Sequence, residues 1–129
     1  MSLAVARLLR TNYEAFSTGN PNPLLESLSE DITWHVSGGS PLAGEYTGKD
    51  DVISFFQKMG QLYGGSLSVE VLDVLASDNH GAVLTLEELQ YQGRPLSFSS
   101  VHLWEVRDGK FSSFRVRYDD AYHKFWPLR

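Results

Sequence analysis

Residues 34–48 read WHVSGGSPLAGEYTG, and this stretch decides how the rest of the chain is interpreted. Three glycines and a proline fall within seven of these residues, so the backbone can turn sharply and approach other segments closely. Trp34 and Tyr46 flank the turn, which indicates that the loop borders something packed or bound. The alternative is a tight connection from a strand to a helix, without chemistry of its own.

On the N-terminal side of this stretch, the sequence predicts a strand preceded by two helices. Residues 32–36 have the β-branched and aromatic content of a strand. Residues 2–18 carry apolar side chains at helical spacing without an internal Gly or Pro. A short second helix is expected to follow Asn22, with Pro23 in its first turn.

On the C-terminal side, a third helix is expected to begin after Thr47 or Gly48 and to end at Gly64. Four strand-like runs follow, and the Asp-Gly pair at 108–109 is a strong signal for a hairpin turn. The runs are residues 67–76, 82–91, 96–106 and 111–118. Helices followed by strands with short turns predict one α+β domain over residues 1–129, with helices on one face of a largely antiparallel sheet.

The composition excludes several classes of partner. The chain has 129 residues, 42% of them hydrophobic, and a formal net charge of −5, so nucleic acid and anionic membrane are poor partners. It contains no cysteine, which excludes a disulfide framework and a thiolate nucleophile. Arg7 interrupts the apolar N-terminal residues, and no run approaches membrane-spanning length. A cytoplasmic protein is the expectation.

The strand expected at 96–106 has apolar residues on both faces. Val101 and Leu103 share one face, and His102 and Trp104 share the other. The helices can cover only one face, so we expect a homodimer through the sheet, with His102 and Trp104 at its interface. In the alternative, His102 and Trp104 lie beneath the C-terminal aromatic pair at 125–126.

The compound pattern W-H-V-x-G-x-S-P-L-A-G-x-Y-x-G, together with V-H-L-W-x-V-x-D-G-K at 101–110, resembles the SnoaL-like group. That group belongs to the nuclear transport factor two-like and ketosteroid isomerase-like superfamily. The resemblance covers nearly the whole chain. It implies a cystatin-like conical half-barrel, in which a curved sheet wraps around three N-terminal helices and a deep apolar cavity. The superfamily includes isomerases, polyketide cyclases, hydrolases and non-catalytic binders, so the fold alone does not name a reaction.

Three residues of the steroid isomerases do not carry over to this chain. The resemblance places Asn12 where those enzymes have an oxyanion-hole tyrosine, Val36 near their carboxylate base, and Val101 near their protonated aspartic acid. Their mechanism needs a carboxylate and acidic donors. Steroid isomerisation by that route is therefore not expected, and Asn12, Val36 and Val101 are expected to line the pocket.

Asp120 and His35 are the predicted catalytic residues. Alternation from Phe114 through Val116 and Tyr118 brings Asp120 to the end of a cavity-facing strand, where an apolar setting would raise its pKa. His35 and His102 are each flanked by aromatic residues, and a neutral imidazole beside a carboxylate can shuttle a proton. The alternatives are an Asp120 that is solvated or caps a turn, and a structural His35. The other two histidines outside the sheet, at 80 and 123, are assigned to the surface.

A mostly apolar pocket is predicted from the aromatic side chains, and it favours a small lipophilic ligand. Its predicted lining is Asn12, Trp34, Val36, Tyr46, Phe55, Phe56, Val101, Phe114, Val116 and Tyr118. The alternative is that these aromatics simply fill the core. In the run at 83–89, either Glu87 or Glu88 must face inward. That residue is either functional or paired, and Arg115 and Arg117 on the neighbouring predicted strand could supply the partner.

Three functions follow as hypotheses. The first is a cofactor-independent cyclase, isomerase or hydrolase with Asp120 as acid or base and Asn12, His35 or Tyr46 as orienting donors. The second is a non-catalytic binder of a lipophilic ligand, and the third is a structural dimer with a filled core. No metal and no cofactor are expected, because the chain has no phosphate loop, no nucleotide fingerprint and no histidine pair at metal-ligand spacing.

Overall fold

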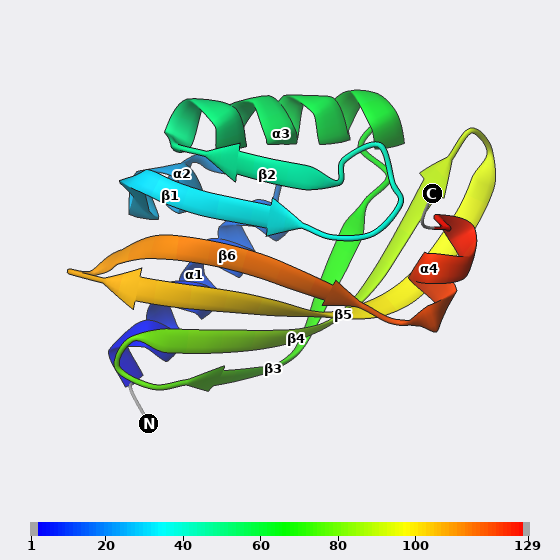
Figure 1. Ribbon diagram of the computed structural model, residues 1–129. Helices are drawn as coiled ribbons and strands as arrows, with labels where there is room; N and C mark the ends of the chain where they lie inside the picture. Colours follow the sequence, from blue (N-terminus) through cyan, green and yellow to red (C-terminus); the bar gives the residue numbers. More distant parts are fainter. Residues whose placement is uncertain (1–2, 128–129) are drawn as a thin grey trace.

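A computed structural model describes residues 3–127, in which four helices and six strands are present (Figure 1). The helices are α1 (Leu3–Ser17), α2 (Asn22–Ser27), α3 (Lys49–Tyr63) and α4 (Asp120–Phe125). The strands are β1 (Leu28–Val36), β2 (Gly44–Thr47), β3 (Ser68–Ala76), β4 (His80–Tyr91), β5 (Arg94–Arg107) and β6 (Lys110–Tyr118). Within the described residues, no helix is both long and apolar enough to cross a membrane.

The six strands form one curved sheet in the order β2-β1-β6-β5-β4-β3. β1 and β6 run parallel, and each other neighbouring pair in this order is antiparallel. The last four strands are consecutive hairpins, because short turns join them. The predicted α+β class and the largely antiparallel sheet are therefore confirmed.

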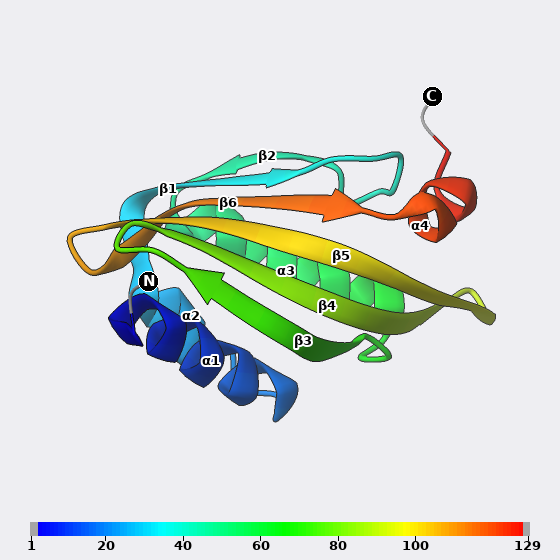
Figure 2. The ribbon, with the colours of Figure 1, turned by 90° about the horizontal axis from the view of Figure 1, so that it is seen from below.

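Three helices lie against one face of the sheet. α1 packs on β3 and β4, whereas α3 packs on β1 and β2 (Figure 2). The side chains between these layers include Leu9, Ile32, Val52 and Phe111, which have no exposed surface at all. The hydrophobic contacts among them hold the helices to the concave face.

Two strand boundaries differ from the sequence prediction. β1 begins at Leu28, before the predicted start of the strand at residue 32, and runs through Glu30 and Asp31. Both acidic side chains are exposed, so they can occupy extended backbone without being buried. β2 lies inside the stretch predicted to be a loop and pairs with β1, with Tyr46 opposite Trp34.

A fourth helix, α4, was not predicted. Its N-cap is Asp119, whose Oδ1 accepts a hydrogen bond from the Tyr122 backbone N–H at 3.2 Å. The other oxygen, Oδ2, accepts from the Ser99 backbone N–H at 2.9 Å and from its hydroxyl at 3.0 Å. These bonds fix α4 at the end of the sheet.

The glycine turn of residues 38–39 lies against the C-terminal segment. A Cβ atom added to Gly39 would lie 2.0 Å from the backbone oxygen of Pro127, and Gly38 has a φ of +101°. Larger residues cannot adopt this arrangement without moving the backbone. The loop therefore does border a packed segment, as its sequence indicates, and that segment is the C-terminus.

The two faces of β5 are the reverse of those that the sequence predicts. His102 and Trp104 point toward α1 and are buried or nearly so, whereas Val101 and Leu103 lie on the outer face. The prediction that His102 and Trp104 form a dimer interface is therefore wrong. They also do not lie beneath the C-terminal aromatic pair, because Trp126 packs on Tyr91, with ring centroids 4.7 Å apart.

Candidate functional site

A cavity of about 110 Å³ lies between the concave face of the sheet and helices α1 and α3. Most side chains in its wall are apolar or aromatic, and they come from α1, α3 and the sheet. The polar exceptions are few and lie close together. This combination of an apolar wall and a few convergent polar groups is typical of small-molecule sites.

The structure places eight of the ten predicted pocket residues in the cavity wall. They are Asn12, Trp34, Val36, Phe55, Phe56, Phe114, Val116 and Tyr118. The other two, Tyr46 and Val101, lie elsewhere. Tyr46 packs on the ring of Phe55 with centroids 5.1 Å apart, and its hydroxyl donates to the Leu42 carbonyl oxygen at 2.7 Å. Val101 is on the outer face of the sheet because its neighbour His102 faces inward.

Trp34 is at the centre of the aromatic wall. Its ring stacks on Phe114 with centroids 4.0 Å apart, and it meets Phe55, Phe56 and Trp104 at 5.6 Å each. Such contacts fix ring orientations as well as burying apolar area. The stretch that opens with Trp34 thus builds the wall of the cavity.

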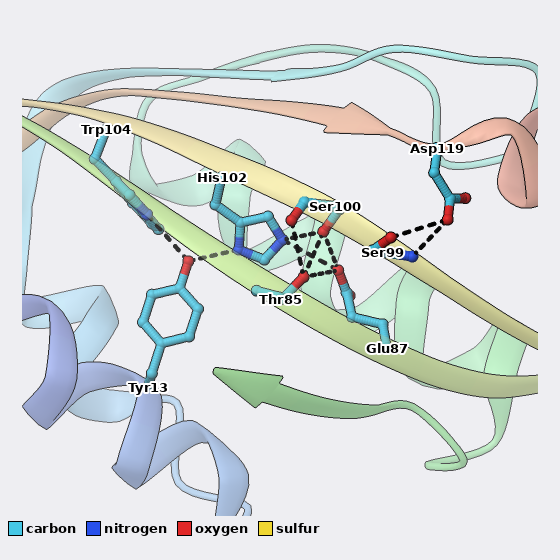
Figure 3. A network of polar contacts seen from close by, with 8 residues as sticks. All are labelled: Tyr13, Thr85, Glu87, Ser99, Ser100, His102, Trp104 and Asp119. Atoms are coloured by element: carbon cyan, nitrogen blue, oxygen red, sulfur yellow. Dashed lines mark hydrogen bonds and ion pairs between the residues drawn. The ribbon is translucent and has the colours of Figure 1, made fainter. Parts of the chain in front are cut away.

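Five polar side chains from three elements form one hydrogen-bonded network inside this apolar setting (Figure 3). Tyr13 comes from α1, Thr85 and Glu87 from β4, and Ser100 and His102 from β5. Tyr13, Glu87 and His102 line the cavity itself. We call these three residues the Glu-His-Tyr relay.

The hydrogen bonds define the direction of the relay. The Trp104 Nε1–H donates to the Tyr13 oxygen at 3.0 Å, and the Tyr13 hydroxyl lies 2.5 Å from His102 Nδ1. On the other side of the ring, His102 Nε2 lies 3.3 Å from Glu87 Oε2. A carboxylate accepts only, so Nε2 carries the proton, and in the neutral imidazole Nδ1 accepts the Tyr13 proton.

Glu87 is held at one of its two oxygens. Thr85 Oγ1 donates to Oε2 at 2.8 Å, and the Ser100 hydroxyl and His102 reach the same atom. Within the described residues, no hydrogen bond reaches Oε1. Since Glu87 also lines the cavity, Oε1 is the carboxylate atom left for a ligand.

Burial and hydrogen bonding act in opposite directions on the ionisation of Glu87. Burial penalises the carboxylate, but the hydrogen bonds from His102, Ser100 and Thr85 and the charge of His102 outweigh this penalty. The net result is a pKa of Glu87 below its usual range. Burial raises the pKa of Tyr13 well above its usual range, so its hydroxyl keeps its proton at neutral pH.

A group of tyrosines closes the end of the cavity nearest α4. Tyr122 comes from α4 and stacks on Tyr118, with ring centroids 3.5 Å apart and planes 9° from parallel. Tyr63 from α3 also lines this end. Burial raises the pKa of all three phenols, so they face the cavity as neutral groups.

Neither predicted catalytic residue reaches the cavity. Asp120 is exposed in the first turn of α4, where the alternation of β6 no longer applies because the strand has ended. His35 lies on the opposite face of β1 from Trp34, and its Nδ1 contacts Glu45 Oε1 at 3.1 Å. The prediction of these two residues as a cavity acid and base is therefore wrong.

The sequence left open which of Glu87 and Glu88 faces inward, and the structure places Glu87 inside. The expected partners, Arg115 and Arg117, are exposed on the outer face, so they do not pair with it. His102 takes that place. Within residues 3–127, no three His, Cys, Asp or Glu side chains gather closely enough to hold a metal ion.

Tyr13, Thr85 and Ser100 were missed as members of the site, although a usable signal was present. The tight turn at Gln92-Gly93 places Tyr91 opposite Arg94, and counting back from that pair places Thr85 opposite Ser100. Glu87 and His102 then lie on the same face as this pair. The helical position of Tyr13 gave no comparable signal, because it resembled the rest of an apolar stripe.

The fold and site together define a class: an α+β protein with a curved sheet over an apolar cavity that holds a few polar groups. The model of the SnoaL-like domain family matches residues 9–114, and the chain belongs to this family. Solved neighbours are described as NTF2-like and as having a ketosteroid isomerase-like fold, which confirms the fold that the sequence predicts.

Three relatives illustrate the range of similarity. An uncharacterised protein of Mycobacterium tuberculosis is 28% identical over 92% of this chain and 93% of its own length. Bal32a, from a soil-derived mobile gene cassette, is 27% identical and superimposes with a TM-score of 0.86 over 95% of this chain and 96% of its own. TerC, co-crystallised with polyporic acid, is 19% identical, with a TM-score of 0.82 over 97% and 98% of the two chains.

Proposed function

We propose that this chain is a cofactor-independent enzyme that moves a proton on a small lipophilic substrate, through the Glu-His-Tyr relay. The observation that carries the proposal is the convergence of Tyr13, Glu87 and His102 in the wall of one apolar cavity. Buried polar groups are costly to a fold unless they are fully paired. A paired network that still borders an empty space is suited to acting on a ligand.

The relay supports an isomerisation or a cyclisation without any co-reactant. A proton leaves a carbon or hydroxyl of the substrate for the Tyr13 oxygen, while the Tyr13 proton passes to His102 Nδ1. The imidazolium that forms is stabilised by the adjacent Glu87 carboxylate. Reversal of these transfers returns a proton to a different substrate atom, so the overall proton balance is zero.

In this mechanism the reacting groups are interior side chains, and Asp120 and His35 take no part. General acid–base catalysis by one positioned group is worth roughly 10² to 10⁴ in rate. TerC, which has the same fold, was co-crystallised with polyporic acid, and this supports the uptake of an organic acid by a protein of this fold.

The test begins with a thermal-shift screen of lipophilic ketones, polyketide-like acids and epoxides. For each hit, exchange of substrate protons in heavy water is followed by NMR. We expect His102→Gln to slow exchange by at least about 100-fold, because the relay loses its proton acceptor. His35→Gln is the matched control and should retain the wild-type rate. Equal rates in both variants would overturn the mechanism.

The second candidate function is a non-catalytic binder of the same ligands. Its support is the saturation of Glu87 Oε2 by three donors, which is the expected state of a structural carboxylate. Hits that bind without any proton exchange, in the wild type as in His102→Gln, would favour it.

We also propose a homodimer through the outer face of the sheet, with a different interface from the one predicted. Leu75, Leu86 and Leu103 are exposed there at 50%, 39% and 37%. Arg115 and Arg117 on β6 flank this apolar stripe on one side, and Glu70 and Asp73 on β3 flank it on the other. A two-fold axis along the strands sets the basic side of one copy over the acidic side of its partner.

A further inference from the structure

A second hollow, of about 260 Å³, lies outside the first cavity, between the end of α1 and the C-terminal half of α3. Five side chains belong to the walls of both hollows, namely Phe16, Phe56, Met59, Tyr63 and Leu67. The two spaces are therefore neighbours across one shared wall. We call the second hollow the outer groove.

The shared wall is apolar and is closed by two aromatic rings. Phe16 from α1 and Phe56 from α3 face each other with ring centroids 5.7 Å apart, and both are only half-buried. These phenyl groups make no hydrogen bonds, so a rotation of either ring breaks none. A ligand that passes between them loses only dispersion contacts, which it replaces with its own.

Glycines keep the outer groove hollow. Gly60 lies within α3, where glycine costs about 1 kcal/mol relative to alanine. A Cβ atom added there would meet no other atom within 4 Å, so close packing does not require a glycine. The consequence of its missing side chain is an open groove beside Phe56 and Met59.

The volumes of the two hollows can be compared with those of typical small-molecule sites. The inner cavity of about 110 Å³ is below the roughly 300–1,000 Å³ of typical small-molecule sites. Together with the outer groove at about 260 Å³, it falls within that range. Among residues 3–127, no charged side chain lines the outer groove, so a charged group would find no partner there.

We propose that the ligand is elongated, with a polar head at the Glu-His-Tyr relay and an uncharged alkyl or aryl tail in the outer groove. The tail passes between Phe16 and Phe56. This inference rests on the proposed function, because the relay defines the position of the head. It adds a specificity-determining position, Gly60, outside the cavity itself.

The experiment uses a homologous series of straight-chain methyl ketones, whose affinities are measured by calorimetry on the full chain. Each methylene buried in the groove should tighten binding by about fourfold in the wild type. Gly60→Phe fills the groove, so long ketones should lose at least about tenfold in affinity while the shortest members bind as before. Gly60→Ala should retain the wild-type dependence on chain length, because a methyl group leaves most of the groove open.

Gln57→Phe is the matched control, since it adds the same ring at an exposed position of α3 that does not line the groove. It should leave every affinity unchanged, and thermal melting confirms that each variant is folded. An equal chain-length dependence in wild type and Gly60→Phe would overturn the outer groove alone. If no ketone of any length binds the wild type, the proposed function falls as well, so the two failures are distinguishable.

Discussion

Strands β4 and β5 each have one row of side chains that faces the helices and one that faces outward. In the middle of this strand pair, polar side chains interrupt the inner row, and apolar side chains lie in the outer row. The inner row contains Thr85, Glu87, Ser100 and His102, and the outer row contains Leu84, Leu86, Val101 and Leu103. The hydrophobic effect alone would favour the reverse arrangement.

The inner row avoids the cost of burial because its members are partners of one another. Thr85 and Ser100 are opposite each other, and both bond to the same oxygen of Glu87. The outer row has no such partners within the described residues, and its leucines are partly exposed. In the arrangement that we propose, one strand pair serves a ligand on one face and a second protein copy on the other.

The largest effect is expected on the rate of proton exchange when the Tyr13 hydroxyl of the relay is removed. Tyr13→Phe removes the hydroxyl that connects His102 to the cavity, and proton exchange of a bound substrate should fall by roughly 10² to 10⁴. Tyr46→Phe removes a hydroxyl that donates to the Leu42 carbonyl oxygen, outside the relay. Its exchange rate should match the wild type in the same NMR assay. If the two variants lose activity equally, Tyr13 has no special role.

The next largest effect is expected on the free energy of unfolding, when the same substitution is made on opposite faces of β4. Glu87→Leu leaves the buried donors Thr85, Ser100 and His102 without their acceptor, which should lower the free energy of unfolding by about 2 kcal/mol or more. Glu88→Leu changes the adjacent exposed position and should stay within about 0.5 kcal/mol of the wild type. Urea denaturation measures both. A Glu88 variant as unstable as the Glu87 variant would remove the distinction between the faces.

The sequence predicted the strands better than it predicted their faces. Hydrophobic periodicity is a sound indicator of strand 96–106, but its apolar residues lie on both sides, so periodicity could not say which side is buried. The buried face of the strand is the one that carries His102, because His102 is paired with Tyr13 and Glu87, and paired polar groups can occupy a core.

The sequence predicts the aromatic wall of the site correctly, but it does not predict the position of Asp120. Aromatic residues of the pocket, such as Trp34 and Phe114, could be predicted because alternation and the family pattern agree on them. Asp120 could not be placed correctly, since the strand ends at Tyr118 and Asp119 starts a short helix there. The chain changes direction at a capping residue, and the hydrophobic pattern does not show this change.

The outer row gives a prediction about assembly. Leu103→Asp puts a charge in the centre of the proposed interface, and light scattering should then show a 14.5 kDa monomer in place of a dimer. Ile53→Asp is the matched control, because Ile53 on α3 has the same 37% exposure as Leu103 but lies away from the sheet. It should remain a dimer. A wild type that is monomeric at micromolar concentration would refute the interface.

The smallest effect concerns how the stability that Glu87 of the inner row contributes depends on pH. The pKa of Glu87 is lowered in the folded chain, so its carboxylate stabilises the fold above the ordinary glutamate pKa of about 4.3. That contribution should disappear as the pH falls from about 4.3 through the folded pKa. The difference in unfolding free energy between wild type and Glu87→Gln should therefore shrink over this window.

Urea denaturation at a series of pH values measures this difference, and Glu88→Gln on the outer face serves as its control. A difference that instead grows as the pH falls would mean that burial outweighs the hydrogen bonds at Glu87. The inner row would then hold a protonated acid, and the direction of the relay would reverse.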